Sequence, residues 1–216
     1  MTVRAEDAHF ETTDWALLLT LSAIWGSSFL LIALGLDAFE PGLVTLLRVG
    51  LGAITLAVVP GARGSIPRRD LGKCALVGLT WMAFPLTLFP IAQQWVDSSV
   101  AGMLNSAMPL MTVLIAWLAF GTPTGPRRLL GVGVGFVGIL LISIPEASSA
   151  STNAIGVLLV IVAVGSYGIA ANLAGPLQRE HGSLPVAAWA LGFAVPFCIP
   201  YGGVGIVGSS FAWSSF

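Results

Sequence analysis

The feature that most constrains this chain is a succession of apolar runs, each about 20 residues long, the length of helix that crosses roughly 30 Å of hydrocarbon. Only 9% of the 216 residues are charged and 56% are hydrophobic, with a mean hydropathy of +0.93. A soluble domain carries about 25% charged residues. The runs do not alternate apolar and polar residues as membrane β-strands do. The sequence therefore predicts an all-α, polytopic transmembrane helix bundle.

The runs give about seven predicted spans, separated by short connections rich in proline, glycine or charge. Residues 1–14 are polar and acidic, as expected of a short soluble tail, and residues 146–153 read as a linker between two groups of helices. The predicted spans are residues 15–36, 42–59, 71–92, 98–120, 128–144, 154–176 and 184–207.

The basic residues fall on alternate connections, which predicts the orientation of the chain. Seven Lys and Arg residues lie on three of the connections, whereas the others carry acidic residues and no Lys or Arg. Basic loops of membrane proteins are retained in the cytoplasm. We therefore expect a cytoplasmic N-terminus, in the cell membrane. The seven are Arg63, Arg68, Arg69, Lys73, Arg127, Arg128 and Arg179.

An aromatic–glycine step occurs twice in the chain, at Trp25-Gly26 and at Tyr167-Gly168. The second copy lies five predicted spans after the first, and because five is odd the copies would have opposite orientations in the membrane. Inverted repeats of this kind are typical of transporters, with the substrate site near the midplane. This divides the chain into a first five-helix repeat over residues 15–145 and a partial second repeat of two helices over residues 154–216, three helices short of a matching unit.

Several short patterns, in this order, resemble the EamA-type transporters of the drug/metabolite transporter superfamily. They are Trp25-Gly26-Ser27-Ser28-Phe29, Pro41 followed by Arg48, residues 101–117 with Asn105 and Pro109, and the glycine-rich residues 131–142. The resemblance implies ten helices in two inverted repeats, both termini in the cytoplasm, and export or exchange of small metabolites such as amino acids. The sequence departs from the family at Gly121-Thr122, where a Gly-Glu is usual, and in the three final helices that it lacks.

Arg48 is the one clearly intramembrane charge in the sequence. A cation at the centre of a span costs on the order of 2.5–3.5 kcal/mol on insertion scales, so it needs a reason to be there. One reading is an anchor for a substrate carboxylate or phosphate, or a gating ion pair. The other is a side chain that snorkels to the interface or packs between helices.

Five further residues are candidates for substrate binding. Asn105 places an amide in hydrocarbon, where it forms a hydrogen bond either to the substrate or to a neighbouring helix. Trp25 stacks on substrate, forms a gate or packs in the core, and Tyr167 is the corresponding candidate in the second repeat. Ser28 belongs to the same polar stretch as Trp25, and Phe84 shares a helix face with Thr80 and Thr87.

The sequence predicts a membrane transporter that moves small metabolites by alternating access, with the lipid bilayer and a small-molecule substrate as partners. The alternative is a truncated or non-transporting membrane scaffold. An intramembrane enzyme is less favoured, because no metal-ligand spacing and no His within a span is present. We expect no cofactor, no metal and no nucleic acid. Gly131, Gly133, Gly135 and Gly138 allow close helix packing, within the chain or in a homo-oligomer.

Overall fold

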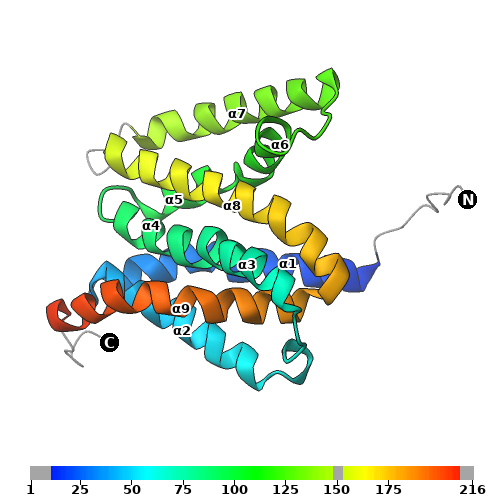
Figure 1. Ribbon diagram of the computed structural model, residues 1–216. Helices are drawn as coiled ribbons and strands as arrows, with labels where there is room; N and C mark the ends of the chain where they lie inside the picture. Colours follow the sequence, from blue (N-terminus) through cyan, green and yellow to red (C-terminus); the bar gives the residue numbers. More distant parts are fainter. Residues whose placement is uncertain (1–10, 148–152, 210–216) are drawn as a thin grey trace, which may run out of the picture.

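Every regular element among the described residues is a helix, in a computed structural model that describes residues 11–147 and 153–209 (Figure 1). The all-α prediction is therefore confirmed for this part of the chain. In chain order the elements are α1 (Thr12–Leu36), α2 (Pro41–Val58), η1 (Pro60–Ala62), α3 (Arg68–Val77), η2 (Gly78–Ala83), α4 (Phe84–Ala92), α5 (Ser98–Asn105), α6 (Met108–Leu118), α7 (Pro126–Ala147), α8 (Ala154–His181) and α9 (Ser183–Gly208).

The predicted spans correspond closely to these helices. Within residues 11–147 and 153–209, five helical stretches are long and apolar enough to cross a membrane, namely α1, α2, α8, α9 and the rod from Arg68 to Ala92 that α3, η2 and α4 form together. The bent pair α5 and α6 brings the number to six. The span predicted at residues 128–144 is occupied by α7, which is not among these six, so a seventh crossing stays a prediction. The predicted linker lies largely outside the described residues, and the repeat boundaries stay predictions.

Two of the helices are interrupted where a proline removes a backbone hydrogen bond. Pro85 has no N–H to offer the carbonyl of the fourth residue before it, and the preceding turn widens into the π-helix η2, in which the Phe84 amide donates to the Leu79 carbonyl five residues back. Pro109 likewise has no N–H to donate to the Asn105 carbonyl, and α5 ends at Asn105. The next helix, α6, is bent by 43° relative to α5.

The helices α2 and α9 pack side by side in opposite directions. Gly205 lies against Leu43, where an added Cβ would stand 2.6 Å from the Leu43 backbone nitrogen, and Gly52 near the other end of α2 faces Leu191. Small residues let two backbones approach this closely. The antiparallel pairing is the arrangement expected if α2 and α9 are corresponding helices of an inverted repeat.

The core lies where α4, α5 and α8 meet, around the fully buried side chain of Phe89. Ser166 on α8 donates to the Thr80 carbonyl (2.7 Å), which fastens α8 to η2. Asn172, further along α8, donates to the Thr112 carbonyl (3.0 Å) on α6. Hydrogen bonds between spans substitute for the water that the hydrocarbon lacks.

The helices α1 and α7 are peripheral. Only 6% of the apolar window of α1 is buried. On α7, an added Cβ at Gly131, Gly133 or Gly138 would meet nothing within 4 Å, whereas one at Gly135 would press on Leu110 of α6. One glycine of the predicted set thus packs within the chain. Oligomerisation through this helix stays a prediction.

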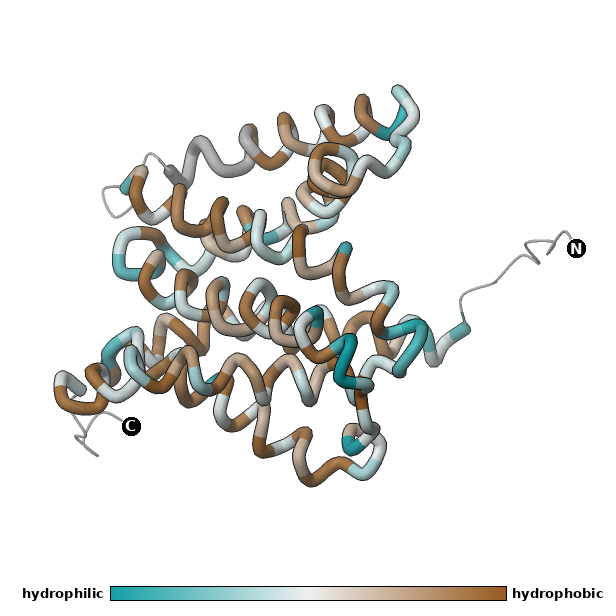
Figure 2. The backbone as a smooth tube through the Cα atoms, viewed as in Figure 1, coloured by the Kyte–Doolittle hydropathy of each residue, from teal (hydrophilic) through white to brown (hydrophobic). Residues whose placement is uncertain are grey.

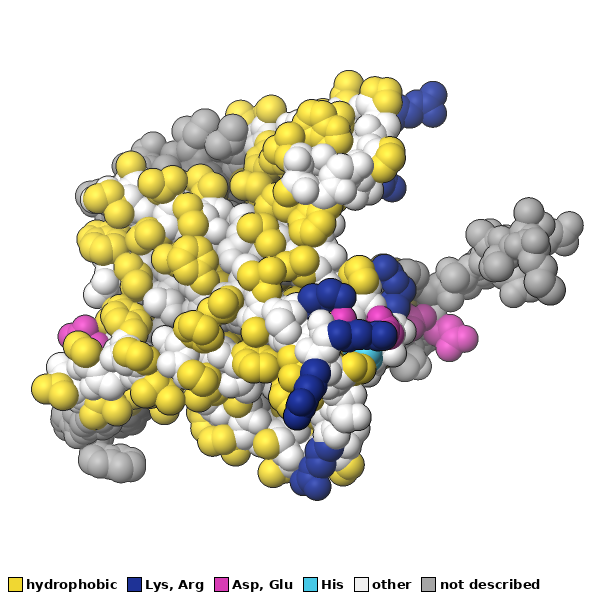
Figure 3. Space-filling view, in the orientation of Figure 1, with side chains coloured by type: hydrophobic (Ala, Val, Ile, Leu, Met, Phe, Trp, Pro, Cys, Tyr) yellow, Lys and Arg dark blue, Asp and Glu magenta, His cyan; other side chains and the backbone are white. Residues whose placement is uncertain are grey.

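Polar residues gather at the two ends of the bundle, and apolar residues line the helices between them (Figure 2). Lys and Arg concentrate at one of these ends (Figure 3). At that end the buried carboxylate of Asp70 accepts from Lys73 (2.7 Å) and contacts His181 of α8 (3.2 Å), while Arg69 pairs with Glu180 (2.8 Å). These ion pairs join the start of α3 to the end of α8.

Candidate functional site

A cavity of about 270 Å³ lies near the middle of the bundle, between α1, α2, α5, α8 and the proline-interrupted rod from η2 to α4. Its walls are mostly apolar, with a few polar groups on different helices. The lining residues are Ile24, Trp25, Ser28, Phe29, Arg48, Trp81, Met82, Leu86, Phe89, Asn105 and Tyr167.

Arg48 is the charged member of this cavity and approaches it from the middle of α2. One terminal nitrogen, Nη2, donates to the Ser28 hydroxyl of α1 at 2.9 Å. The other, Nη1, is buried and has no hydrogen-bond partner among the described residues. The Arg48 side chain lines the cavity. A buried donor without an acceptor costs roughly 1–3 kcal/mol, and more when it is charged. The unpartnered nitrogen therefore favours binding of an anionic ligand.

Asn105 supplies the complementary group. It is the last residue of α5, at the point where Pro109 interrupts the helix. Its side-chain oxygen Oδ1 is buried and accepts no hydrogen bond from any described residue. An amide acceptor enclosed in hydrocarbon requires a donor. The cavity thus contains one unpartnered donor and one unpartnered acceptor on different helices.

Aromatic rings make the apolar part of the wall. Phe29 meets Phe89 edge to face, with ring centroids 5.3 Å apart. Phe89 stacks on Tyr167 of α8 at 6.0 Å. Trp25 and Trp81 complete the set. Such rings bury a large apolar surface and offer flat faces to an apolar ligand group.

The cavity brings together five of the six residues that the sequence singles out, namely Trp25, Ser28, Arg48, Asn105 and Tyr167. Phe84 does not line it and is 48% exposed. Phe84 was predicted from the threonines on its face of the rod, but the Thr80 and Thr87 hydroxyls donate to backbone carbonyls of the same rod, at 2.7 Å each. They therefore do not indicate which face looks inward.

Four residues on the inward face of this rod were missed: Trp81, Met82, Leu86 and Phe89. All are apolar, so in a membrane protein their type carries no signal about function. The one available clue was Pro85, because a proline within a span is where a helix opens and irregular backbone lines a cavity.

The sequence pattern of a known family matches residues 14–144, and the family is described as the EamA-like transporter family. Among curated proteins, a "Probable terminal-alkyne amino-acid exporter" of Streptantibioticus cattleyicolor is 30% identical over 86% of this chain and 62% of its own length. The "Uncharacterized inner membrane transporter YedA" of Escherichia coli K12 is 27% identical over 80% of the chain and 55% of its own length.

A third relative, the "Uncharacterized transporter YdfC" of Bacillus subtilis, is 25% identical over 84% of the chain and 60% of its own length. The chain thus spans about three fifths of the length of the curated relatives it matches. No solved structure matches it significantly.

Proposed function

The chain belongs to the EamA-like transporter family of multi-pass membrane proteins, and from this premise we propose that it serves the transport of small zwitterionic metabolites, amino acids with apolar side chains, through the central cavity. The single observation that supports this proposal most is the pairing of two unsatisfied groups in one cavity: Arg48 Nη1 as a donor and Asn105 Oδ1 as an acceptor. A carboxylate satisfies the first and an ammonium group the second.

The rest of the wall supports an apolar side chain on this substrate. Phe29, Phe89 and Tyr167 present ring surfaces, and among the described residues that line the cavity none is acidic or carries a second positive charge. A second charge on the substrate would enter without a partner, which is costly in a low-dielectric site. The substrate we propose therefore carries one carboxylate, one amino group and an uncharged remainder.

We propose that movement occurs by alternating access around this fixed site. The interruptions beside Pro85 and Pro109 place a π-turn and a helix bend at the cavity, and discontinuous helices at mid-membrane are where transporters hold substrate and change shape. Among the described residues that line the cavity, no carboxylate is available for a proton relay. We therefore propose that substrate moves by exchange or down its own concentration gradient.

Orientation and direction belong to the same proposal. Lys and Arg lie at one end of the bundle (Figure 3), and α1 starts at that end (Figure 1). Basic residues of membrane proteins favour the cytoplasmic side, so we propose that this end faces the cytoplasm and that the protein lies in the cell membrane. Export as the direction is supported by the printed name of the Streptantibioticus relative. Because the family and these relatives are transporters, we propose no catalytic activity.

A matched trio of solutes tests the proposal. Norleucine carries both charged groups, hexanoate has the same carbon chain without the amino group, and pentylamine is the amine without the carboxylate. Whole protein in proteoliposomes should exchange labelled norleucine, with both analogues competing more weakly. Equal competition by hexanoate would remove the role of Asn105, and equal competition by pentylamine would remove that of Arg48. Absence of exchange for every amino acid would reject the substrate class.

A further inference from the structure

A second hollow, of about 630 Å³, lies on the flank of the bundle between the end of α2 and the start of α9, and the α2–α3 loop closes it. It shares no residue with the central cavity. We call it the flank groove. Its lining residues are Leu56, Ala57, Ala62, Arg63, Gly64, Ser65, Ala188, Trp189, Gly192 and Phe193.

The part of the flank groove between α9 and Leu56 of α2 is apolar and open. Trp189 and Phe193 stand on successive turns of α9, with ring centroids 5.9 Å apart. Between them, an added Cβ at Gly192 would meet nothing within 4 Å. Leu56 forms the facing wall on α2. This part has the chemistry of a slot for a hydrocarbon chain, because its walls offer dispersion contacts and no polar group that needs a partner.

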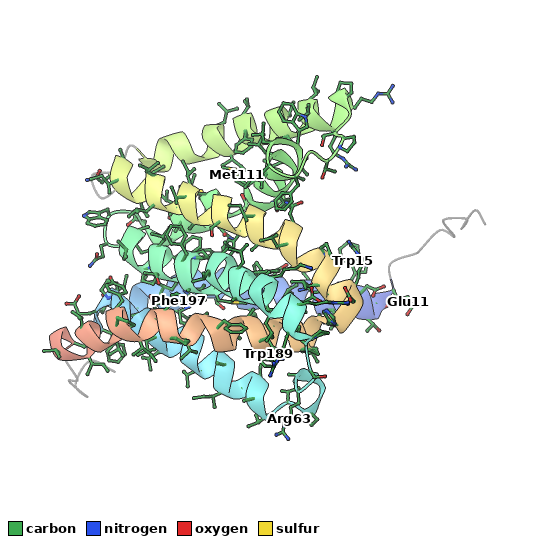
Figure 4. All side chains as sticks on the ribbon, in the orientation of Figure 1. Glu11, Trp15, Arg63, Met111, Trp189 and Phe197 are labelled. Atoms are coloured by element: carbon green, nitrogen blue, oxygen red, sulfur yellow. The ribbon has the colours of Figure 1, made fainter. Side chains whose placement is uncertain are left out.

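The part of the flank groove formed by the α2–α3 loop is polar and rich in hydrogen-bond donors. Arg63 is exposed, and its Nε donates to the Ala57 carbonyl at 3.2 Å, while neither terminal nitrogen has a hydrogen-bond partner among the described residues. The backbone amides of Gly64 and Ser65 donate to no other described group. Trp189 Nε1 donates to the Gly64 carbonyl at 3.1 Å, which fixes the loop against α9. Figure 4 shows Trp189 on α9 next to the loop that carries Arg63.

The position of the flank groove matches the depth of a lipid headgroup. Both helices that wall it are candidate membrane spans, so the surrounding solvent is lipid. Arg63 follows η1, the short turn after α2, and Figure 4 places it at the end of the bundle where Lys and Arg gather in Figure 3. Arg68, Arg69 and Lys73 follow within ten residues of it. A guanidinium with free backbone amides beside it is a set of donors that suits a phosphate.

We propose that the flank groove binds one anionic phospholipid, with its phosphate on Arg63 and the Gly64–Ser65 amides and one acyl chain along Trp189, Gly192 and Phe193. Basic pockets between spans on the cytoplasmic side hold anionic headgroups by this chemistry. The bound lipid closes the gap between α2 and α9 and ties the α2–α3 loop to the membrane surface. This site is independent of the central cavity and of what that cavity carries.

Lipid binding to the whole purified protein, read by native mass spectrometry, tests the site. The probes are dioleoyl phosphatidylglycerol and dioleoyl phosphatidylcholine, which have the same chains and differ in net charge. The unmodified protein should prefer phosphatidylglycerol. Arg63→Gln should weaken phosphatidylglycerol binding about fivefold, since one basic residue near the surface contributes about that much. Arg128→Gln removes a charge from α7, outside the flank groove, and should leave the preference unchanged.

Gly192→Leu fills the apolar slot and should weaken both lipids, with the protein still monodisperse because the space is open. Glycerol phosphate, which carries the charge without acyl chains, should not displace the lipid. The proposal is overturned if Arg63→Gln and Arg128→Gln act equally, if Gly192→Leu has no effect, or if glycerol phosphate competes fully. It is also overturned if the whole protein shows no lipid preference, as when another part of the chain fills the flank groove.

Discussion

The guanidinium of Arg48 on α2 and the hydroxyl of Ser28 on α1 are joined by a hydrogen bond of 2.9 Å at the edge of the central cavity. This bond fixes Nη2, while the other terminal nitrogen, Nη1, has no partner among the described residues. A planar fork with one arm anchored is pre-organised for a carboxylate oxygen, because less rotational freedom is lost when substrate binds.

Substitution of Arg48 should impair transport while leaving the protein in the membrane. Arg48→Ala should lower kcat/KM about 30-fold or more, the usual effect of truncating one partner of a buried charged pair. Arg48→Lys keeps the charge but cannot span Ser28 and a carboxylate together, so its KM should rise with kcat less affected. Proteoliposome flux with matched protein amounts measures both. Unchanged flux in Arg48→Ala would reduce the residue to a packing role.

Ser28→Ala is a milder test of the same relationship. It releases Nη2 without removing the charge, so the expected loss is about tenfold in affinity, the range of a hydrogen bond to a charged group. Ser27→Ala is the matched control, because the Ser27 hydroxyl donates to the Ile24 carbonyl of its own helix. Equal effects of the two substitutions on norleucine exchange would contradict the anchoring role of Ser28.

Asn105→Leu should change selectivity more than it changes general activity. The substitution keeps a similar volume and removes the acceptor Oδ1, so norleucine should bind about tenfold more weakly. Hexanoate, which has no amino group, should bind as before. Ligand-induced protection against thermal unfolding measures both affinities in one preparation. A parallel loss for the two ligands would show that Asn105 supports the helix bend and not the substrate amine.

Trp25 and Phe84 form a matched aromatic pair for testing the cavity wall. They are 47% and 48% exposed, yet only Trp25 lines the cavity. Trp25→Ala should weaken substrate binding roughly three- to tenfold, as expected for the loss of an aromatic contact. Phe84→Ala should leave affinity unchanged. If Phe84→Ala has the larger effect in exchange assays, the substrate takes a path that does not pass through this cavity.

The polar members of the candidate site could be selected from the sequence alone, because a cation or an amide within hydrocarbon stands out from its surroundings. Arg48 and Asn105 could be selected on that ground, and the structure brings both to one cavity. Phe89 could not, since an apolar ring in an apolar helix is indistinguishable from core. The π-turn before Pro85 could be anticipated as a disturbance, but not its register, which depends on how η2 packs against α8 and α9.

The choice of partner for each helix was also beyond the sequence. The glycines of residues 131–138 stood out in the sequence, but the closest glycine contacts join α9 to α2 through Gly42 and to η2 through Gly78. A small residue permits close approach but does not specify which helix approaches. That choice is made by the whole set of surfaces, which a single sequence does not display.

The α2–α9 contact can be tested with two glycines that stand two residues apart on α9. A Cβ at Gly205 would lie 2.6 Å from the Leu43 backbone nitrogen, so Gly205→Ala must push the two helices apart. Overpacking of this kind costs about 1–3 kcal/mol, and the apparent melting temperature in detergent should fall by several degrees. At Gly203 an added Cβ would meet nothing within 4 Å, and Gly203→Ala should leave the melting temperature unchanged. Equal stability of the two variants would show that α2 and α9 are not in close contact in the membrane protein. Because the contact lies away from Arg48, norleucine affinity should be unaltered in whatever fraction of Gly205→Ala remains folded.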